Sequence, residues 1–569
     1  MNAPHEPLVV VEGLQVVARR DGGPETTIVN NVGFSVGRGE VLALIGESGS
    51  GKTTIALSLL GYARRGCRIA GGCVRVDGTD VLALDDRALR TLRGRKVAYV
   101  AQSAAASFNP SRTIMNQVIE GAQIHGLMTP QQARFKAVEL FRALALPAPE
   151  TIGERYPHQV SGGQLQRLMA AMALINDPDV VVFDEPTTAL DVTTQIDVLR
   201  AFKEAIRERH TSAVYVSHDL AVVAQMADLV VVLNGGEIQE YGEIGQILTN
   251  PQHPYTRSLL AAARPETVVE TVEQAPSAQP TESAGIRPLL EVSGLSAGYG
   301  KPDRQGVPPI KVLTDIDLRV ARGTTLGIIG ESGSGKSSLA WTIAGLVAPY
   351  QGQIRFDGRP LAPRFMQRDQ DDRRRIQLVF QNADTVLNPK RTIEEILMRP
   401  LQVFNCCPPD KVRQRVIQLL DMVRLPAAIA QRLPSELSGG QKQRINLARA
   451  LAAEPDLILC DEVTSALDTV VGAAILELLA ELRRELGLAY IFISHDISVV
   501  RAICDEVMVL YRGKQVDHCA RGELTVPPRH PYTDLLVNSV PELRQGWLEE
   551  ATARIGADRS RQQLLAERQ

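Results

Sequence analysis

The sequence has no excess of either charge and no long apolar run. Lys and Arg number 62 against 65 Asp and Glu, which gives a net charge of −3. A protein that binds nucleic acid usually carries a basic excess or a basic stripe, so this balance argues against direct nucleic-acid binding. No apolar run approaches the roughly 18 residues that a membrane-spanning helix needs. Any role at a membrane is therefore expected to come through a partner.

Signs of secretion and of a cysteine-built site are also missing. The first residues, MNAPHEPLVVVEG, contain no basic stretch followed by an apolar core, so we expect no secretory signal. The 7 cysteines include no CxxC pair and no other metal-ligand spacing. We therefore expect reduced thiols in a cytosolic protein rather than disulfides or a structural metal.

What the sequence does contain is an internal duplication, a feature that decides how the rest is interpreted. GESGSGKTT at 46–54 returns as GESGSGKSS at 330–338. Four later motifs return at one constant spacing, the spacing from Asp184 to Asp461. They are HQVSGGQLQR, which returns as SELSGGQKQR, VVVFDEPTTALD as LILCDEVTSALD, VSHDL as ISHDI, and HPYT unchanged. Ordered matches at near-constant spacing indicate two homologous units in tandem.

The stretch between the two units predicts a linker. ETVVETVEQAPSAQPTESAG, at 266–285, contains no Lys, Arg or aromatic residue and cannot bury a core. We therefore predict a first domain over 1–265, a flexible linker over 266–287, a second domain over 288–545 and a charged tail over 546–569.

Short apolar runs in each unit end in a polar residue. The first unit has VLALIG, VAYVAQ, VVVFDE and AVYVSHD, and the second has TLGIIG, IQLVFQ, LILCDE and AYIFISHD. Apolar runs of about 4–8 residues without polar alternation are typical of strands buried on both faces, as in a parallel sheet. Ligands of such α/β sheets bind at the carboxyl ends of the strands, where these polar residues stand. The pattern predicts an α/β fold in both units.

The glycine-rich repeats follow the first of these runs and match the phosphate-binding pattern GxxxxGK followed by Ser or Thr. Their glycines let backbone N–H groups wrap phosphates, and the following helix directs its positive end at them. Lys52 and Lys336 are expected to contact the β- and γ-phosphates, with Thr53 and Ser337 on Mg²⁺. The predicted nucleotide-binding residues of the two loops are Gly46, Glu47, Ser48, Gly49, Ser50, Gly51, Lys52, Thr53 and Thr54, and Gly330, Glu331, Ser332, Gly333, Ser334, Gly335, Lys336, Ser337 and Ser338.

An acidic pair ends another apolar run in each unit. Asp184 and Asp461 are expected to hold the Mg²⁺ shell. The adjacent Glu185 and Glu462 are placed to polarise an attacking water. A DE pair alone is common in solvated turns, but after a phosphate loop in both units it predicts nucleotide hydrolysis.

Together these motifs resemble one family, the ATP-binding cassette (ABC) ATPases. In that family the signature loop of one cassette caps the γ-phosphate bound to the other cassette. The resemblance implies two tandem P-loop nucleotide-binding domains, each with a mixed or parallel sheet core and a helical subdomain, and two composite ATP sites. The residues that match the signature are Ser161, Gly162, Gly163 and Gln164, and Ser438, Gly439, Gly440 and Gln441.

The resemblance also assigns roles to residues after the strands. It implies that His218 and His495, which follow the motif aspartates at the same spacing in both units, sense the γ-phosphate. Gln102 and Gln381 would contact Mg²⁺ or water and relay ATP occupancy to a partner. The predicted catalytic residues are Glu185, Glu462, His218, His495, Gln102 and Gln381. The predicted metal-binding residues are Thr53, Gln102, Asp184, Ser337, Gln381 and Asp461.

The two units differ where the family stacks adenine on an aromatic residue. The second unit offers Tyr299 in LSAGYG, whereas the first has Ala18 in GLQVVARRDGG. Base–aromatic stacking is worth about 1–3 kcal/mol, so we predict roughly tenfold weaker nucleotide binding at the first unit's phosphate loop. Arg19 or Arg20 could stack instead and remove this difference.

Two further motifs narrow the resemblance to one branch. FNPSRTI and LNPKRTI follow shortly after Gln102 and Gln381, and HPYT closes each unit. These resemble the ATPase subunits of oligopeptide, dipeptide and nickel importers, which are normally two separate chains. Some of those relatives hold an iron–sulfur cluster on cysteines after HPYT. No cysteine follows Cys519 here, nor lies between His253 and Cys406, so we expect no such cluster.

The resemblance implies an ATP-hydrolysing subunit, peripheral at the cytoplasmic face of the cell membrane, that powers import of small peptides or related solutes. Its partners would be two transmembrane permease subunits and an extracytoplasmic substrate-binding protein. One alternative is a tandem-cassette translation factor on the ribosome, but the short acidic linker lacks the charge for RNA phosphates. Another is a DNA-repair ATPase, whose zinc-binding CxxC modules are missing. Nickel, opines and sugars remain alternative cargoes.

Overall fold

The computed structural model describes residues 7–19, 24–188, 190–264, 287–465 and 467–554. Their contacts divide the chain into two units, the first comprising residues up to 263 together with those from 541, and the second comprising 264–540. The predicted linker lies almost wholly outside the described residues. Among the helices that are described, none is long and apolar enough to cross a membrane.

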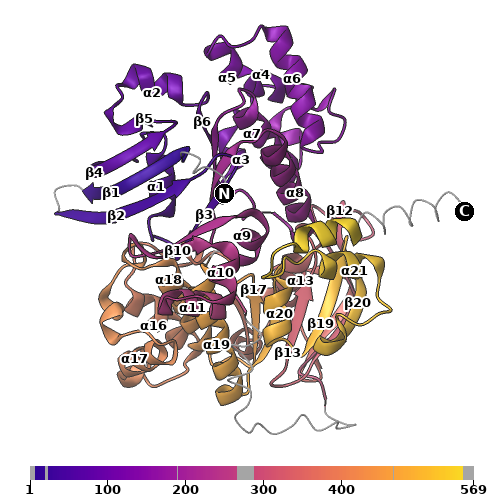
Figure 1. The fold of residues 1–569 in the computed structure, drawn as a ribbon. Helices are drawn as coiled ribbons and strands as arrows, with labels where there is room; N and C mark the ends of the chain where they lie inside the picture. The colour runs from indigo at the N-terminus through magenta and orange to yellow at the C-terminus, as the bar shows by residue number, and fades with distance from the viewer. Residues whose placement is uncertain (1–6, 20–23, 189, 265–286, 466, 555–569) are drawn as a thin grey trace, which may run out of the picture. The chain divides into compact units, whose positions relative to one another are not determined.

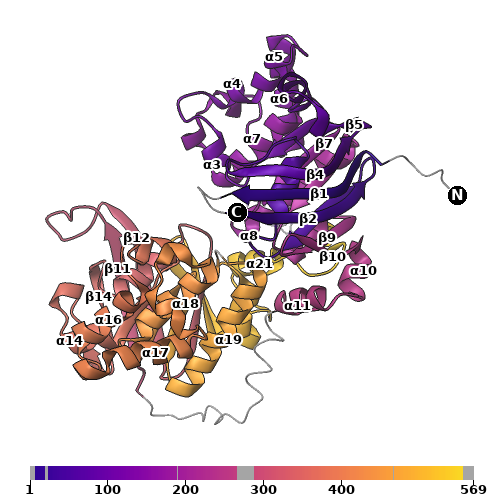
Figure 2. The same cartoon turned by 90° about the vertical axis from the view of Figure 1, so that its left-hand side faces the viewer.

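The first unit contains a four-stranded antiparallel sheet with the strand order β2-β1-β4-β5. Figure 2 shows β1, β2 and β4 side by side. Two register shifts interrupt the pairing of β1 with β4. The strands of this sheet are β1 (Val9–Arg19), β2 (Glu25–Val36), β4 (Cys67–Val76) and β5 (Thr79–Asp80).

A six-stranded sheet forms the core of the first unit, with the order β10-β9-β3-β8-β7-β6. All neighbours are parallel except β10, which pairs antiparallel with β9. Every residue of β3, β7 and β8 is buried, which confirms the expectation of strands covered on both faces. The strands are β3 (Val41–Gly46), β6 (Val97–Val100), β7 (Val180–Asp184), β8 (Ser212–Val216), β9 (Leu229–Asn234) and β10 (Glu237–Glu243).

The helices of the first unit fall into a group around the core sheet and a separate helical subdomain. Helices α4, α5 and α6 lie together at one end of the unit, with α7 between them and the strands (Figure 1). The helices are α1 (Lys52–Ser58), α2 (Asp86–Leu92), α3 (Ala104–Ser107), α4 (Ile114–Val118), α5 (Glu120–Ile124), α6 (Pro130–Ala143), α7 (Gly162–Leu174), α8 (Val192–Glu208), α9 (Leu220–Met226), α10 (Ile244–Thr249) and α11 (Pro254–Ala262).

The second unit repeats this architecture, as the sequence duplication predicts. Its sheets have the orders β12-β11-β14-β15 and β16-β17-β18-β13-β19-β20. The strands are β11 (Leu290–Tyr299), β12 (Ile310–Val320), β13 (Thr325–Ile329), β14 (Pro349–Phe356), β15 (Arg359–Pro360), β16 (Ile376–Val379), β17 (Leu457–Asp461), β18 (Ala489–Ile493), β19 (Glu506–Tyr511) and β20 (Lys514–Ala520). The helices are α13 (Lys336–Ile343), α14 (Gln370–Arg375), α15 (Ala383–Val386), α16 (Ile393–Phe404), α17 (Val412–Met422), α18 (Gly439–Leu451), α19 (Thr469–Leu486), α20 (Ile497–Ile503) and α21 (Pro531–Asn538).

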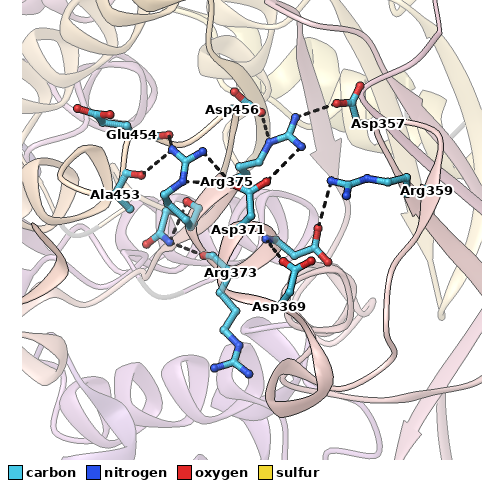
Figure 3. Close-up of polar contacts among 12 residues, drawn as sticks. Asp357, Arg359, Asp369, Asp371, Arg373, Arg375, Ala453, Glu454 and Asp456 are labelled. Atoms are coloured by element: carbon cyan, nitrogen blue, oxygen red, sulfur yellow. Dashed lines mark hydrogen bonds and ion pairs between the residues drawn. The ribbon is translucent and has the colours of Figure 1, made fainter. Parts of the chain in front are cut away.

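One basic residue ties the two sheets of the second unit together. Arg375, at the end of α14, binds Asp357 through Nη2 at 3.0 Å and Asp456 through Nε at 2.5 Å (Figure 3). Asp357 lies in the turn between β14 and β15, and Asp456 immediately precedes β17. Burial opposes the charge of Arg375, but these two carboxylates hold its pKa above the ordinary value. In the first unit Lys96 has the same role, with Asp77 at 2.5 Å.

Candidate nucleotide-binding sites

The first phosphate loop connects β3 to α1 and closes around the side chain of Lys52. Lys52 is 6% exposed, and its Nζ donates hydrogen bonds of 2.7 Å to the carbonyl oxygens of Gly46 and Glu47. Ser50 is 3% exposed, and its hydroxyl has no hydrogen-bond partner among the described residues. A buried hydroxyl without a partner is costly, and a phosphate oxygen is an acceptor that would satisfy it.

The loop requires glycine for its backbone shape. Gly49 and Gly51 have φ angles of 84° and 95°, a left-handed conformation that other residues adopt only with strain. A Cβ atom at Gly46 would lie 2.0 Å from the carbonyl oxygen of Leu233 on β9. The equivalent glycines of the second loop have the same left-handed conformations. These positions therefore require glycine, Gly49 and Gly51 for their φ angles and Gly46 for the close approach of β9.

The second phosphate loop connects β13 to α13 with the same contacts. Nζ of Lys336 donates to the carbonyl oxygen of Gly330 at 2.7 Å and to that of Glu331 at 2.9 Å. The hydroxyl of Ser334 is again buried without a hydrogen-bond partner among the described residues. Both loops therefore present the same ammonium and the same unsatisfied hydroxyl.

The predicted metal-binding hydroxyls and carboxylates meet in both units. Thr53 Oγ1 donates a 2.9 Å hydrogen bond to Asp184 Oδ1, and Ser337 Oγ donates one of 2.9 Å to Asp461 Oδ1. Burial raises the pKa of Asp461, an effect that the hydrogen bond from Ser337 opposes. Hydroxyl and carboxylate oxygens are the ligands that Mg²⁺ prefers, so these pairs fit that ion.

The side chain of Glu185 contacts two of the other predicted site residues. Nε2 of Gln102 donates to its Oε2 at 2.9 Å, and Nδ1 of His218 lies 3.2 Å from its Oε1. Burial alone would raise the pKa of Glu185, but the hydrogen bond and charge of His218, together with Lys52, hold that pKa below its ordinary value. Burial also opposes protonation of His218, yet Glu185 holds the histidine pKa above its ordinary value. The pair therefore favours an ionised carboxylate beside a protonated imidazole.

The same cluster forms around Glu462 in the second unit. Nε2 of Gln381 donates to Oε2 of Glu462 at 2.7 Å and to Oγ of Ser465 at 3.3 Å. Nδ1 of His495 lies 3.7 Å from the same Oε2. The contact with His495 holds the pKa of Glu462 below its ordinary value, against the effect of burial. In both units the glutamine contacts the glutamate rather than the metal-binding aspartate.

The signature residues form exposed helix starts. Ser161 precedes α7, where its Oγ accepts a 3.3 Å hydrogen bond from the N–H of Gln164 and its own N–H donates to Gln164 Oε1 at 3.1 Å. This reciprocal capping box recurs at Ser438 and Gln441, before α18. Both serines are exposed. Each signature therefore presents a capped helix N-terminus to the surroundings.

Comparison with known families settles what these sites belong to. The family described as ABC transporter matches residues 29–188 and 313–465, the two segments that carry the phosphate loops and acidic pairs. The chain is an ABC transporter ATPase. A second family, described as Oligopeptide/dipeptide transporter, C-terminal region, matches residues 239–286 and 520–566, in each case C-terminal to the ABC transporter match. The predicted two-cassette α/β fold and the ATPase activity are thereby confirmed.

Named ABC relatives match nearly the whole chain. The glutathione import ATP-binding protein GsiA of Pectobacterium atrosepticum is 37% identical over 570 residues, which is 95% of this chain and 90% of the relative. The peptidoglycan transport ATP-binding protein YejF of Agrobacterium fabrum is 37% identical over 541 residues, which is 94% of this chain and 96% of the relative. The match therefore includes both cassettes at once.

Two tyrosines that sequence reasoning did not assign to the sites contact the cassettes' phosphate loops. The hydroxyl of Tyr532 accepts a 2.7 Å hydrogen bond from the N–H of Glu331, and that of Tyr255 accepts one of 3.3 Å from the N–H of Glu47. Both belong to HPYT motifs. The recurrence of HPYT in both units is the sequence signal for these tyrosines, although from the sequence alone the motif indicates only the branch of the family.

Two other tyrosines distinguish the cassettes from each other. Tyr99 on β6 donates to Asp184 at 2.7 Å. The hydroxyl of Tyr299, at the end of β11, lies 2.9 Å from that of Ser338 in the second phosphate loop. Ala18 stands at the equivalent place on β1. The predicted adenine-stacking residue is thus adjacent to a phosphate loop, and its stacking role stays a prediction.

Proposed function

We propose that this ABC ATPase powers a membrane importer of small peptides or peptide-like solutes. The observation that carries the proposal is the Oligopeptide/dipeptide transporter region, which is matched once C-terminal to each ABC transporter match. Relatives named for glutathione import and for peptidoglycan transport support a peptide-like cargo, because glutathione is a small peptide and peptidoglycan contains peptide stems. Nickel, opines and sugars are the competing cargoes.

Each ATP binds between the phosphate loop of one cassette and the signature residues of the other. The N-termini of α7 and α18, which begin at exposed serines, support this arrangement, because N–H groups in the first turn of a helix are donors for phosphate oxygens. One site uses Lys52, Asp184 and Glu185 with Ser438–Gln441. The other uses Lys336, Asp461 and Glu462 with Ser161–Gln164. A single cassette therefore cannot complete either site.

Within a site each side chain has a separate task in attack of water on the γ-phosphorus, which breaks the bond to the β–γ bridging oxygen and releases ADP and phosphate. Lys52 exchanges its two carbonyl partners for β- and γ-phosphate oxygens. Thr53 and Asp184 would hold Mg²⁺, which would supply positive charge to offset that of the phosphates. Glu185 orients the water and accepts its proton, and His218 holds the glutamate ionised before turnover. Lys336, Ser337, Asp461, Glu462 and His495 have these tasks in the second cassette.

Attachment to the membrane is peripheral, at the cytoplasmic face, through two permease subunits, and an extracytoplasmic protein delivers the cargo. The helical subdomains support contact with an apolar partner surface, because they expose large apolar side chains. Ile124 at the end of α5 is 75% exposed and Phe135 on α6 is 65% exposed. Ile417 on α17 is 51% exposed. Movement of these subdomains on ATP binding is then transmitted to the permeases.

The test is purification of the tagged full chain from its native membranes in mild detergent, followed by identification of the proteins that accompany it. Two multi-spanning proteins at equal stoichiometry with an extracytoplasmic binding protein are the expected result. Ribosomal proteins without a membrane partner would overturn the importer assignment. Proteoliposomes of the complex then distinguish cargoes, because small peptides, and not nickel or sugars, should stimulate ATP hydrolysis. The matched control is the Lys52→Ala, Lys336→Ala double variant.

A further inference from the structure

The last described segment of the chain belongs by its contacts to the first unit, although the second unit precedes it in the sequence. Residues 541–554, here called the C-terminal arm, belong to the first unit, although residues 264–540 form the second. The sequence predicts a charged tail over 546–569, and residues 547–554 of this segment are helical. The chain therefore passes back to the first cassette after Val540.

Apolar side chains of the arm enter the core of the first cassette. Trp547 and Leu548 are each 2% exposed and Ala551 is 0% exposed. All three belong to the buried apolar cluster that also contains Phe202 of α8 and Met226 of α9. A fully buried tryptophan contributes a large apolar contact area, so the arm is docked rather than loosely apposed.

A buried amide in the first cassette recognises the backbone of the arm. Gln225 on α9 is 2% exposed. Its Nε2 donates to the carbonyl oxygens of Glu542 at 2.9 Å and of Arg544 at 2.7 Å. Its Oε1 accepts a 3.0 Å hydrogen bond from the N–H of Leu548. These bonds fix the position of the arm along α9, because a buried amide tolerates few other arrangements.

An ion pair adds a contact from the neighbouring helix. Nζ of Lys203 on α8 lies 2.8 Å from Oε1 of Glu549. The same Nζ donates a 2.6 Å hydrogen bond to the carbonyl oxygen of Gln225. Lys203 therefore links α8, α9 and the arm at one point.

The second cassette lacks both of these polar side chains. At the spacing that relates the two acidic pairs, Ala480 on α19 corresponds to Lys203, and Ala502 on α20 corresponds to Gln225. These alanines are 6% and 3% exposed and pack against each other. The arm follows the second cassette in the chain, yet its specific polar partners exist only in the first. This difference indicates that the arm binds specifically to the first cassette and not to the homologous surface of the second.

The docking helix also borders the nucleotide site of the first cassette. Asp219 caps α9 by accepting hydrogen bonds from the N–H groups of Ala221 and Val222. His218, the residue beside Glu185, immediately precedes this cap. Gln225 lies one residue before the end of the same helix. The arm therefore binds the helix that follows His218, the predicted γ-phosphate sensor.

We propose that the C-terminal arm is an intramolecular tether that keeps the two cassettes joined when no nucleotide is bound, independently of the linker over 266–287. Because the docked arm is a second connection, the cassettes remain at a high effective concentration relative to each other, and their association stays intramolecular. This role goes beyond the proposed import function and does not depend on the cargo.

The first test cleaves the linker over 266–287, so that the arm is the remaining connection between the cassettes. A protease site placed within the linker allows the purified full chain to be cleaved, and the mass of the product is measured by sedimentation in EDTA without nucleotide. The two halves should remain together as one particle near the 61.9 kDa of the intact chain. Removal of residues 542–569 should release them, whereas removal of only 555–569 should not.

Three outcomes of that experiment would overturn the proposal. The first is separation of the halves although the arm is intact. The second is a particle that stays together to the same extent without the arm. The third is a particle of twice the mass, which would mean that the arm docks on a second copy of the chain.

A second measurement reads docking directly in the uncut protein. The chain has 2 tryptophans, so a Trp341→Phe variant reports on Trp547 alone. We expect blue-shifted emission that iodide does not quench. The double variant Lys203→Ala, Gln225→Ala gives the first cassette the alanines that the second cassette has at these positions, so it should fold. Its emission should shift to the red, and iodide should quench it. Arg200→Ala on α8, whose ion-pair partner is Asp197, is the matched control. Unchanged emission in the double variant would contradict the assigned contacts.

Discussion

Tyr99 donates a 2.7 Å hydrogen bond to Oδ2 of Asp184, whose Oδ1 accepts the bond from Thr53. Asp461 receives the corresponding bond from Ser337, but Leu378 occupies the place of Tyr99 on strand β16. Both oxygens of the first aspartate are therefore oriented by protein donors, whereas among the described residues Ser337 is the one side-chain donor to the second. The two ATP sites of this chain thus differ at the metal-binding carboxylate, although both carry the phosphate-loop pattern and the acidic pair.

Tyr99→Phe tests whether this second donor matters for the metal. Burial, with the adjacent Asp184, raises the pKa of Tyr99, so the phenol stays protonated and remains a donor. Loss of a hydrogen bond to a charged acceptor costs about 1.5–3 kcal/mol, and we expect the Mg²⁺ concentration for half-maximal ATPase activity to rise about tenfold. The measurement is a Mg²⁺ titration in a Glu462→Gln background. Leu378→Phe should have no effect, and an unchanged titration of Tyr99→Phe would show that the bond is only structural.

Replacement of the two glutamates tests their role toward water. Glu185→Gln and Glu462→Gln keep the shape of the side chain but remove the proton acceptor, so the double variant should lose roughly 10²–10⁴-fold in ATPase rate. ATP should still bind and become trapped, which rapid filtration with labelled ATP measures. Each single variant reports on the remaining site. Normal hydrolysis by the double variant would show that these carboxylates are not the catalytic groups.

The contact between His218 and Glu185 predicts how stability depends on pH. Glu185 holds the pKa of His218 above its ordinary value of 6.5 in the folded state, against the opposing effect of burial. The stabilisation is therefore fully present below the unfolded-state pKa and is lost as the pH rises through the folded-state pKa. His218→Gln should lower the Tm most below pH 6.5, and the difference from the wild type should shrink as the pH rises above that value. Melting curves across this range are the check. A pH-independent difference would mean that the histidine contributes by packing rather than by charge.

The aromatic asymmetry predicts unequal nucleotide affinity. Tyr299 lies next to Ser338 of its phosphate loop, and Ala18 stands in its place in the first cassette. The Lys336→Ala variant, which reports on the first phosphate loop, should bind ATP roughly tenfold more weakly than Lys52→Ala. Fluorescent ATP titrations of both variants decide this. Equal affinities would sink the prediction, and Tyr299→Ala in the Lys52→Ala background should abolish any difference.

Much of each site could be predicted from the sequence because its chemistry is local. The phosphate loops depend on glycines with left-handed φ angles and on the lysine that directly follows the last of them, so these features can be recognised within nine consecutive residues. The strand runs ending in Asp184 and Glu185 are recognisable by their unbroken apolar character. Repetition of these short patterns at a fixed spacing determined that there are two cassettes.

Only the tertiary structure decided which distant residues meet. Tyr99 and Asp184 are 85 positions apart, Glu331 and Tyr532 are 201 apart, and Gln225 and Glu542 are 317 apart. Such contacts depend on the order of strands in a sheet and on where a chain end docks, and no local period or propensity encodes either. The arm illustrates this most clearly, because its charged composition resembles a solvated tail. A few buried side chains and a complementary amide on another part of the chain give it a fixed place.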